Sequence, residues 1–107
     1  MFTRTIEVNL KNDTRQAFVK KFRAEVLPIL KKTPGFHDVI VLENETDANK
    51  VFAISFWETK KNAEHYEKEW YPKVNAIVEP FFHTPPVVKY HTVEETLTEK
   101  LFPKVMV

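Results

Sequence analysis

The chain opens on a segment in which apolar and polar residues alternate. In residues 2–10 the apolar side chains fall on one side of an extended chain: Phe2, Ile6, Val8 and Leu10. A period of two predicts a β-strand. Short apolar segments at residues 36–43, 50–58 and 87–93 predict three further strands, and the polar turn at residues 44–49 joins the second to the third.

Between the strands, apolar residues recur at helical spacing. From Thr14 to Lys32 this pattern predicts a helix, and Pro28 within it predicts a kink near Ala24–Val26. Thr59 is placed to cap a second helix, which Tyr71 and Pro72 interrupt before it continues. The two helical segments therefore separate the strands into the order β-α-β-β-α-β.

This order predicts an α+β, ferredoxin-like fold with a four-stranded antiparallel sheet. The 107 residues suffice for one domain, which we expect over residues 1–93. Residues 94–107 form a C-terminal tail that is either a short helix or an arm packed on a neighbouring molecule.

Both faces of the predicted sheet are apolar, and two helices can cover only one of them. In the third strand, Phe52, Ile54 and Phe56 alternate with residues of the other face. They would form a large exposed patch on a monomer. A homodimer with the two sheets face to face is the simplest way to bury them.

The other face of the third strand carries the small residues Ala53 and Ser55, which leave space under the helices. We expect a pocket for a small molecule there, closed at one end by Trp57. Aromatic side chains of the helices would line it: Phe18, Phe22, Tyr66 and Trp70. The alternative is that these aromatic residues simply fill the core.

Composition excludes much of enzyme chemistry. There is no cysteine, so disulfides and thiolate catalysis are excluded, and the single glycine, Gly35, excludes a phosphate-binding loop. The net charge of +1 gives no reason to expect nucleic acid as a partner. No apolar run is long enough to span a membrane, and the N-terminus alternates, so we expect a cytoplasmic protein.

Few residues are candidates for general acid–base catalysis or metal binding. The histidines, His37, His65, His83 and His91, show no metal-ligand spacing, so we expect no metal site. His65, beside Tyr66, is the candidate general base, although a solvated position is the alternative. Asn9, at the end of the first strand, is placed either to orient a substrate oxygen or to form a turn.

Several short segments, taken in order, resemble one known family. Pro34-Gly35-Phe36 opens the second strand, Phe56-Trp57-Glu58 ends the third, and Pro85-Pro86 precedes the last. Over about residues 2–93 the chain resembles the antibiotic biosynthesis monooxygenase domain of the dimeric α/β-barrel superfamily.

The resemblance implies a homodimer whose two sheets close into an α/β-barrel, with one pocket in each protomer between the sheet and the helices. It also implies an oxygenase that acts on a phenol, quinol or anthrone without metal or flavin, because the deprotonated substrate itself reduces oxygen. Trp57 matches the pocket tryptophan of the anthrone-oxidising relatives. Their asparagine and tyrosine are replaced here by Ala53 and Ala63.

Three alternatives stay open at this point. The haem-degrading relatives use an axial histidine where this chain has Asn75 or Ala76. RNA-recognition domains share the order of elements, but Val51 and Ile54 replace their glycine and a stacking aromatic residue. The third alternative is a dimeric barrel that binds a small apolar ligand without turning it over.

Overall fold

The structure is a computed structural model that describes residues 1–94 and residue 100. Its elements are, in order, β1 (Phe2–Asn9), α1 (Arg15–Lys21), a π-helical turn η1 (Phe22–Val26), α2 (Leu27–Lys32), β2 (Phe36–Glu43), β3 (Lys50–Trp57), α3 (Lys60–Glu69), α4 (Tyr71–Val78), a 3₁₀ turn η2 (Glu79–Phe81) and β4 (Val87–Thr92). The strands and helices predicted from the sequence are all present. The expectation for the tail falls on residues outside those that the structure describes.

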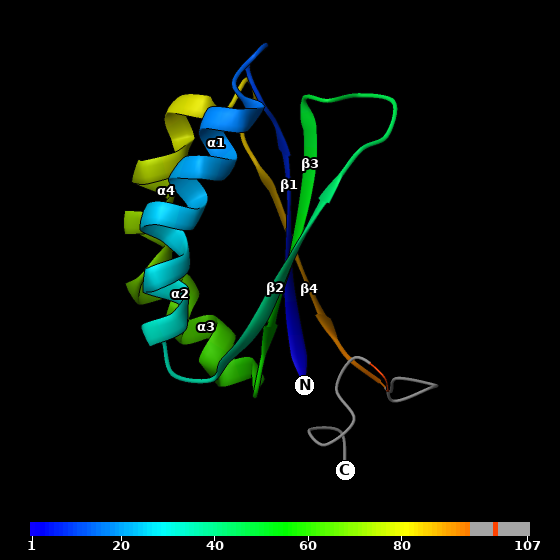
Figure 1. Cartoon of the computed structure of the whole chain (residues 1–107). Coiled ribbons are helices and arrows are strands. Elements are labelled where there is room, and N and C mark those ends of the chain that lie inside the picture. The colour runs from blue at the N-terminus through cyan, green and yellow to red at the C-terminus, as the bar shows by residue number, and fades with distance from the viewer. Residues whose placement is uncertain (95–99, 101–107) are drawn as a thin grey trace.

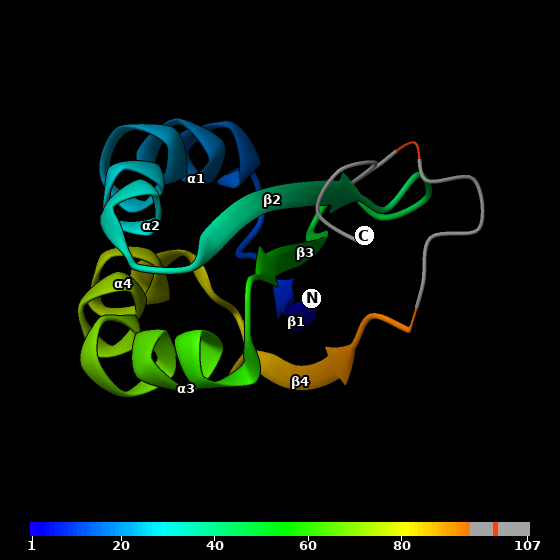
Figure 2. The ribbon, with the colours of Figure 1, turned by 90° about the horizontal axis from the view of Figure 1, so that it is seen from below.

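The strands form one sheet in the order β2-β3-β1-β4, and each neighbouring pair is antiparallel. The helices lie together on one face of this sheet (Figure 1), and the view from below separates the two layers (Figure 2). The predicted ferredoxin-like α+β fold is therefore confirmed. β1, the first strand of the chain, is central and pairs with both β3 and β4.

The first helix is irregular where the sequence predicts it. Between α1 and α2 the chain makes a π-turn, in which the N–H of Leu27 donates to the carbonyl of Phe22. Pro28 follows directly and has no N–H of its own, so regular α-helical bonding cannot continue through this point. The turn places Phe22 and the buried Val26 toward the sheet.

One position in β2 differs from the predicted alternation. A bulge between Phe36 and Asp38 shifts the register, so that Phe36 pairs with Trp57. Its ring packs on Trp57, with ring centroids 5.5 Å apart. The sequence pattern places Phe36 on the same face as Ile40 and Leu42, and this is wrong, because the extra residue of a bulge reverses the alternation.

The second face of the sheet has no helix of the described residues packed on it (Figure 1). Ile40 pairs with Ile54 and Leu42 with Phe52 across this face. Leu42 is 48% exposed, and Ile40, Phe52 and Ile54 are partly buried. We call these four residues the open-face patch. Among the described residues, no helix is both long and apolar enough to cross a membrane.

Candidate functional site

A cavity lies between the sheet and the helices, with free space of about 60 Å³. Its walls come from β1, β2 and β3 on one side and from both helical segments on the other. The lining residues are Arg4, Ile6, Val8, Phe18, Phe22, Val26, Leu30, Val39, Val41, Val51, Ala53, Ser55, Tyr66, Tyr71, Val74, Val78 and Phe82. The cavity is therefore mainly aliphatic and aromatic, with few polar groups.

Five of the residues chosen from the sequence meet at this cavity: Phe18, Phe22, Ala53, Ser55 and Tyr66. The small side chains of β3 face the helices, as predicted, and the space is found over them. Tyr66 is buried at 3% exposure and faces the sheet from α3. The second strand of the chain adds Val39 and Val41, which pair with Ser55 and Ala53.

Trp57 lies behind the cavity wall and does not line it. It is fully buried, and its indole N–H donates to the Ser55 hydroxyl at 2.9 Å. That hydroxyl in turn donates to the carbonyl of Arg4 at 3.1 Å. Trp57 also packs on Tyr66, with ring centroids 4.9 Å apart. Its position supports two lining residues and gives it no contact with a ligand in the cavity.

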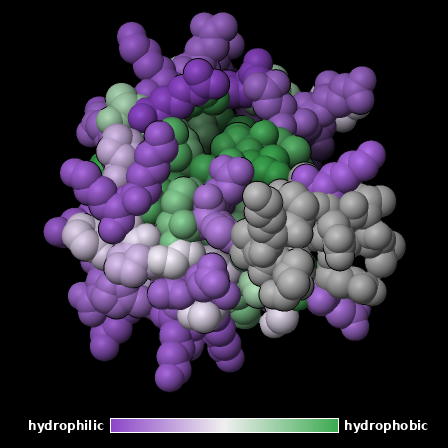
Figure 3. All heavy atoms as spheres, turned by 60° about the horizontal axis from the view of Figure 1, so that its bottom comes forward, coloured by the Kyte–Doolittle hydropathy of each residue, from purple (hydrophilic) through white to green (hydrophobic). Residues whose placement is uncertain are grey.

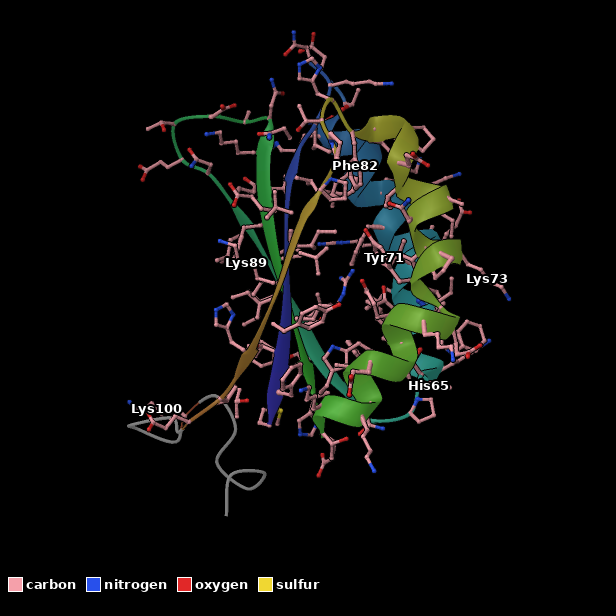
Figure 4. All side chains as sticks on the ribbon, turned by 180° about the vertical axis from the view of Figure 1, so that it is seen from behind. His65, Tyr71, Lys73, Phe82, Lys89 and Lys100 are labelled. Carbon is pink, nitrogen blue, oxygen red and sulfur yellow. The ribbon has the colours of Figure 1, made fainter. Side chains whose placement is uncertain are left out.

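Three further candidates lie away from the cavity. The amide of Asn9 donates to the Thr84 hydroxyl at 3.1 Å, at the end of the sheet, because Asn9 is out of phase with the helix-facing residues of β1. His65 is exposed on the outer side of α3 (Figure 4). Trp70 packs at the edge of the core, with Lys73 Nζ 5.0 Å from its ring centroid. None of the three lines the cavity.

The sequence analysis missed Arg4, although the alternation of β1 contains the signal. Arg4 is in phase with Phe2, Ile6 and Val8, and it lines the cavity with only 4% exposure. Its Nε donates to Glu67 Oε2 at 2.7 Å, an ion pair that joins β1 to α3. A charged residue in phase with an apolar strand face is the pattern that could have identified it.

Tyr71 was also missed, since the sequence identifies it only as the point where the second helix is interrupted. The interruption turns its ring toward the sheet (Figure 4), and Arg4 Cζ lies 4.1 Å from the ring centroid. Arg4 Cζ also lies 5.4 Å from the centroid of Tyr66. Such stacking of a guanidinium on aromatic faces is favourable and is stronger away from water.

Burial sets the protonation of these groups. It raises the pKa of Tyr66 and of Tyr71, and the nearby Arg4 cation opposes the rise only in part. Burial alone would lower the pKa of Arg4, but the charge of the Glu67 carboxylate and the phenol oxygen of Tyr66 raise it above its ordinary value. At neutral pH the cavity therefore contains one cation and neutral phenols.

A groove of about 310 Å³ borders the cavity between α1, η1 and β2. It shares Phe18, Phe22, Val39 and Val41 with the cavity lining. Figure 3 shows apolar side chains gathered in a hollow that hydrophilic side chains surround. Ligand pockets usually measure a few hundred Å³, roughly 300 or more. A ring-sized ligand would therefore enter only if side chains between groove and cavity move.

Within the part of the chain that the structure describes, no three histidine or acidic side chains gather as a metal site would require. The fold and the cavity together define a class: a small α+β domain of ferredoxin-like topology with an aromatic-lined cavity between sheet and helices. The family model for antibiotic biosynthesis monooxygenases matches residues 1–77. The chain belongs to this family.

Solved structures show the same fold. A protein of Bordetella bronchiseptica described as an antibiotic biosynthesis monooxygenase is 16% identical, with a TM-score of 0.75 over 88% of this chain and 97% of that one. A cofactor-independent oxygenase from Streptomyces nogalater is 17% identical, with a TM-score of 0.74 over 90% and 95%.

A monooxygenase of Streptomyces coelicolor, solved in complex with nanaomycin D, is 16% identical, with a TM-score of 0.75 over 90% of this chain and 89% of that one. None of the curated proteins compared with the chain matches it. At these identities the structural likeness establishes the fold, and the family model establishes the family.

Proposed function

We propose that this protein is a monooxygenase that acts on a small aromatic substrate, a phenol, quinol or anthrone, without metal or flavin. The observation that carries the proposal is the cavity between sheet and helices in a chain of the monooxygenase family, which is lined mainly by aromatic and aliphatic side chains. The solved oxygenase described as cofactor-independent has the same fold and supports the proposal.

The proposed reaction uses the substrate as its own reductant. A deprotonated phenol or anthrone transfers electrons to O₂, one oxygen atom is bonded to carbon, and the other leaves as water. The protein then has to bind the ring, favour its deprotonated form and exclude water. Phe18 and Phe22 from the first helical segment and Tyr66 from α3 would hold the ring against Ala53 of β3.

Oxygen uptake tests the proposal. Metal-free protein is mixed with a panel of phenols, hydroquinones and anthrone in an oxygen electrode, and ¹⁸O₂ labelling identifies the oxygenated product. We expect uptake above the buffer rate with at least one member. Ala53→Phe fills the cavity and should lower the rate more than about tenfold, because overpacking there displaces the ring.

The matched control is Ala24→Phe, which adds the same side chain at an exposed position of η1 and should leave the rate unchanged. If panel members raise the melting temperature and none is oxygenated, the alternative of a non-catalytic ligand-binding domain is correct. If Ala53→Phe leaves oxygen uptake unchanged, the cavity is not the site of the reaction.

We also propose that two copies associate through the sheet. The open-face patch of Ile40, Leu42, Phe52 and Ile54 is apolar and is continuous across β2 and β3. A second copy presents the same patch, so a twofold arrangement would bury both at once. The family resemblance supports such a homodimer. A cytoplasmic location stays a prediction.

A further inference from the structure

Arg4 is the charged residue of the described cavity lining, and the proposed reaction does not use it. It projects from the central strand β1 toward the helices, between its pairing partners Ser55 and Tyr90. With 4% exposure, it is among the most deeply buried polar residues of the described chain. An arginine is rarely buried to this extent unless its charge has a specific partner.

Glu67 satisfies only part of the guanidinium. A guanidinium has five N–H donors, and Nε uses one of them on the Glu67 carboxylate at 2.7 Å. Nη2 is buried and has no hydrogen-bond partner among the described residues. The hydroxyls of Tyr71 and Tyr90 are close enough to interact with the guanidinium by charge and by side-chain hydrogen bonding, but neither oxygen is placed to accept from Nη2. Two donors of a buried cation are therefore left without an acceptor.

Among the described residues, no other group of the cavity accepts from Nη2. The Ser55 hydroxyl is already bonded to Trp57 and to the carbonyl of Arg4. The Tyr71 hydroxyl donates to Asn75 Oδ1 at 3.4 Å. No histidine or carboxylate is present among the lining residues. A buried donor that the protein does not satisfy is costly, so a ligand that satisfies it gains affinity.

We propose that the cavity selects a small aromatic ligand that carries an oxyanion, and that Arg4 Nη2 binds this oxyanion. The shared chemistry is a negatively charged oxygen on an apolar ring, either a carboxylate or a phenolate. The ring of the ligand would contact the aromatic lining. The oxyanion would accept the hydrogen bonds that Nη2 of the guanidinium leaves unmade. This inference rests on the proposed site and names the class of ligand that the site takes.

The arrangement has a consequence for ionisation. Burial raises the pKa of Tyr66 and Tyr71, and Arg4 offsets this only in part. A ligand phenol that accepts directly from the unsatisfied Nη2 gains a charge-assisted hydrogen bond, and we expect this bond to outweigh burial and lower the pKa of the bound phenol. The protein would then favour the deprotonated substrate without a general base beside it. This accounts for a cavity whose lining contains neither a histidine nor a carboxylate.

Matched pairs of probes test the inference in the absence of turnover. Benzoate and benzamide have nearly the same shape, but only benzoate carries an oxyanion. By calorimetry at neutral pH we expect benzoate to bind about tenfold or more tightly than benzamide.

4-Nitrophenol tests whether the cavity also binds a phenolate, because the ionised form of this probe absorbs visible light. In the complex it should ionise at a lower pH than in buffer.

Arg4→Met removes the charge and retains much of the volume. It should bring the affinities for benzoate and benzamide close together and abolish the shift in the titration of 4-nitrophenol. The partly exposed Glu67 can be solvated in this variant, and Arg4→Met with Glu67→Gln serves if the single variant unfolds. Lys73→Met is the control, since it removes a cation that points away from the cavity (Figure 4).

The two probe measurements on the wild-type protein are enough to support or overturn the inference, even if the Arg4 variants do not fold. If benzoate binds no more tightly than benzamide, and 4-nitrophenol ionises at the same pH with and without protein, the inference is wrong and Arg4 is only a clamp between β1 and α3. If one probe shows the effect and the other does not, the inference holds for that oxyanion alone. Oxygen uptake with neutral substrates would still support the proposed function, so the two failures are distinguishable.

Discussion

At the scale of single residues, the site depends on three side chains from two distant parts of the chain: Arg4 on one side, and the neighbours Tyr66 and Glu67 on the other. Arg4 and Glu67 are 63 residues apart and meet in one ion pair. Tyr66, next to Glu67, packs on Trp57 and faces the cavity. The same burial that shields the cavity from water also holds the Tyr66 hydroxyl in its protonated form, and this links stability to pH.

Tyr66 should make the protein less stable in alkali. Burial raises the pKa of Tyr66 above its ordinary value of 10.0. The unfolded chain therefore releases this proton at a lower pH than the folded chain, and stability falls as the pH rises above about 10. The melting temperature should be unaffected by Tyr66 ionisation below about pH 9 and should decrease between about pH 9 and pH 11.

Tyr66→Phe should make this decrease shallower, although Tyr71 and Tyr90 also have raised pKa values and will leave part of it. Circular dichroism melts over the same pH series check the slope. An identical slope in Tyr66→Phe would show that the buried phenol does not control the alkaline loss of stability.

At the scale of elements, the turn from α2 into β2 fixes where the second strand meets the second helix. Gly35 has a positive φ of 80°, a conformation that side chains with Cβ rarely adopt. A Cβ placed there would overlap the side chain of Asn62 in α3. The carbonyl of Gly35 accepts from the N–H of Glu58 at 2.8 Å. This close approach sets β2 beside the start of α3, which carries Tyr66 and Glu67.

Gly35→Ala should lower stability by about 2 kcal/mol, from backbone strain together with contact against Asn62. We expect a decrease of several degrees in melting temperature, roughly 4 °C for each kcal/mol. Gly35→Asn separates the two causes, because asparagine tolerates this φ better while bringing the same Cβ. If Gly35→Ala melts like the wild type, the turn must have another conformation.

The order and limits of the elements could be predicted from the sequence, because alternation, helical spacing and caps such as Thr59 are local signals. Five of the seventeen residues that line the cavity followed from the same signals, since the small residues Ala53 and Ser55 mark the space. Arg4 could not be placed with its partner, because the ion pair with Glu67 depends on tertiary packing. The face of Phe36 depends on a bulge, which leaves no trace in the alternation.

At the scale of the whole molecule, the two faces of the sheet have different roles. The helix-facing side encloses the cavity, and the opposite side carries the open-face patch. Lys89 projects from that opposite side (Figure 4) and places a charge near the edge of the sheet. The proposed association therefore does not compete with ligand binding for the same residues.

Ile54→Lys should separate the proposed homodimer. Ile54 lies in the middle of the patch and is partly buried in the chain itself, so a lysine there would place charge in the interface. By light scattering on a sizing column, we expect the wild type near twice 12.7 kDa and the variant near 12.7 kDa. Ala24→Lys, at an exposed helical position, should not change the mass. A wild-type mass near 12.7 kDa would rule out this association.

The central place of β1 has a consequence for how the protein is made. β1 is synthesised first, but its neighbours come much later: Phe2 pairs with Trp57 on one side and with Thr92 on the other. A nascent chain must keep this strand, and its arginine, unpaired until most of the domain has left the ribosome. Contacts between residues that are far apart in the sequence slow folding. A chaperone that binds β1 would therefore protect the nascent chain most during the interval before β3 has been synthesised.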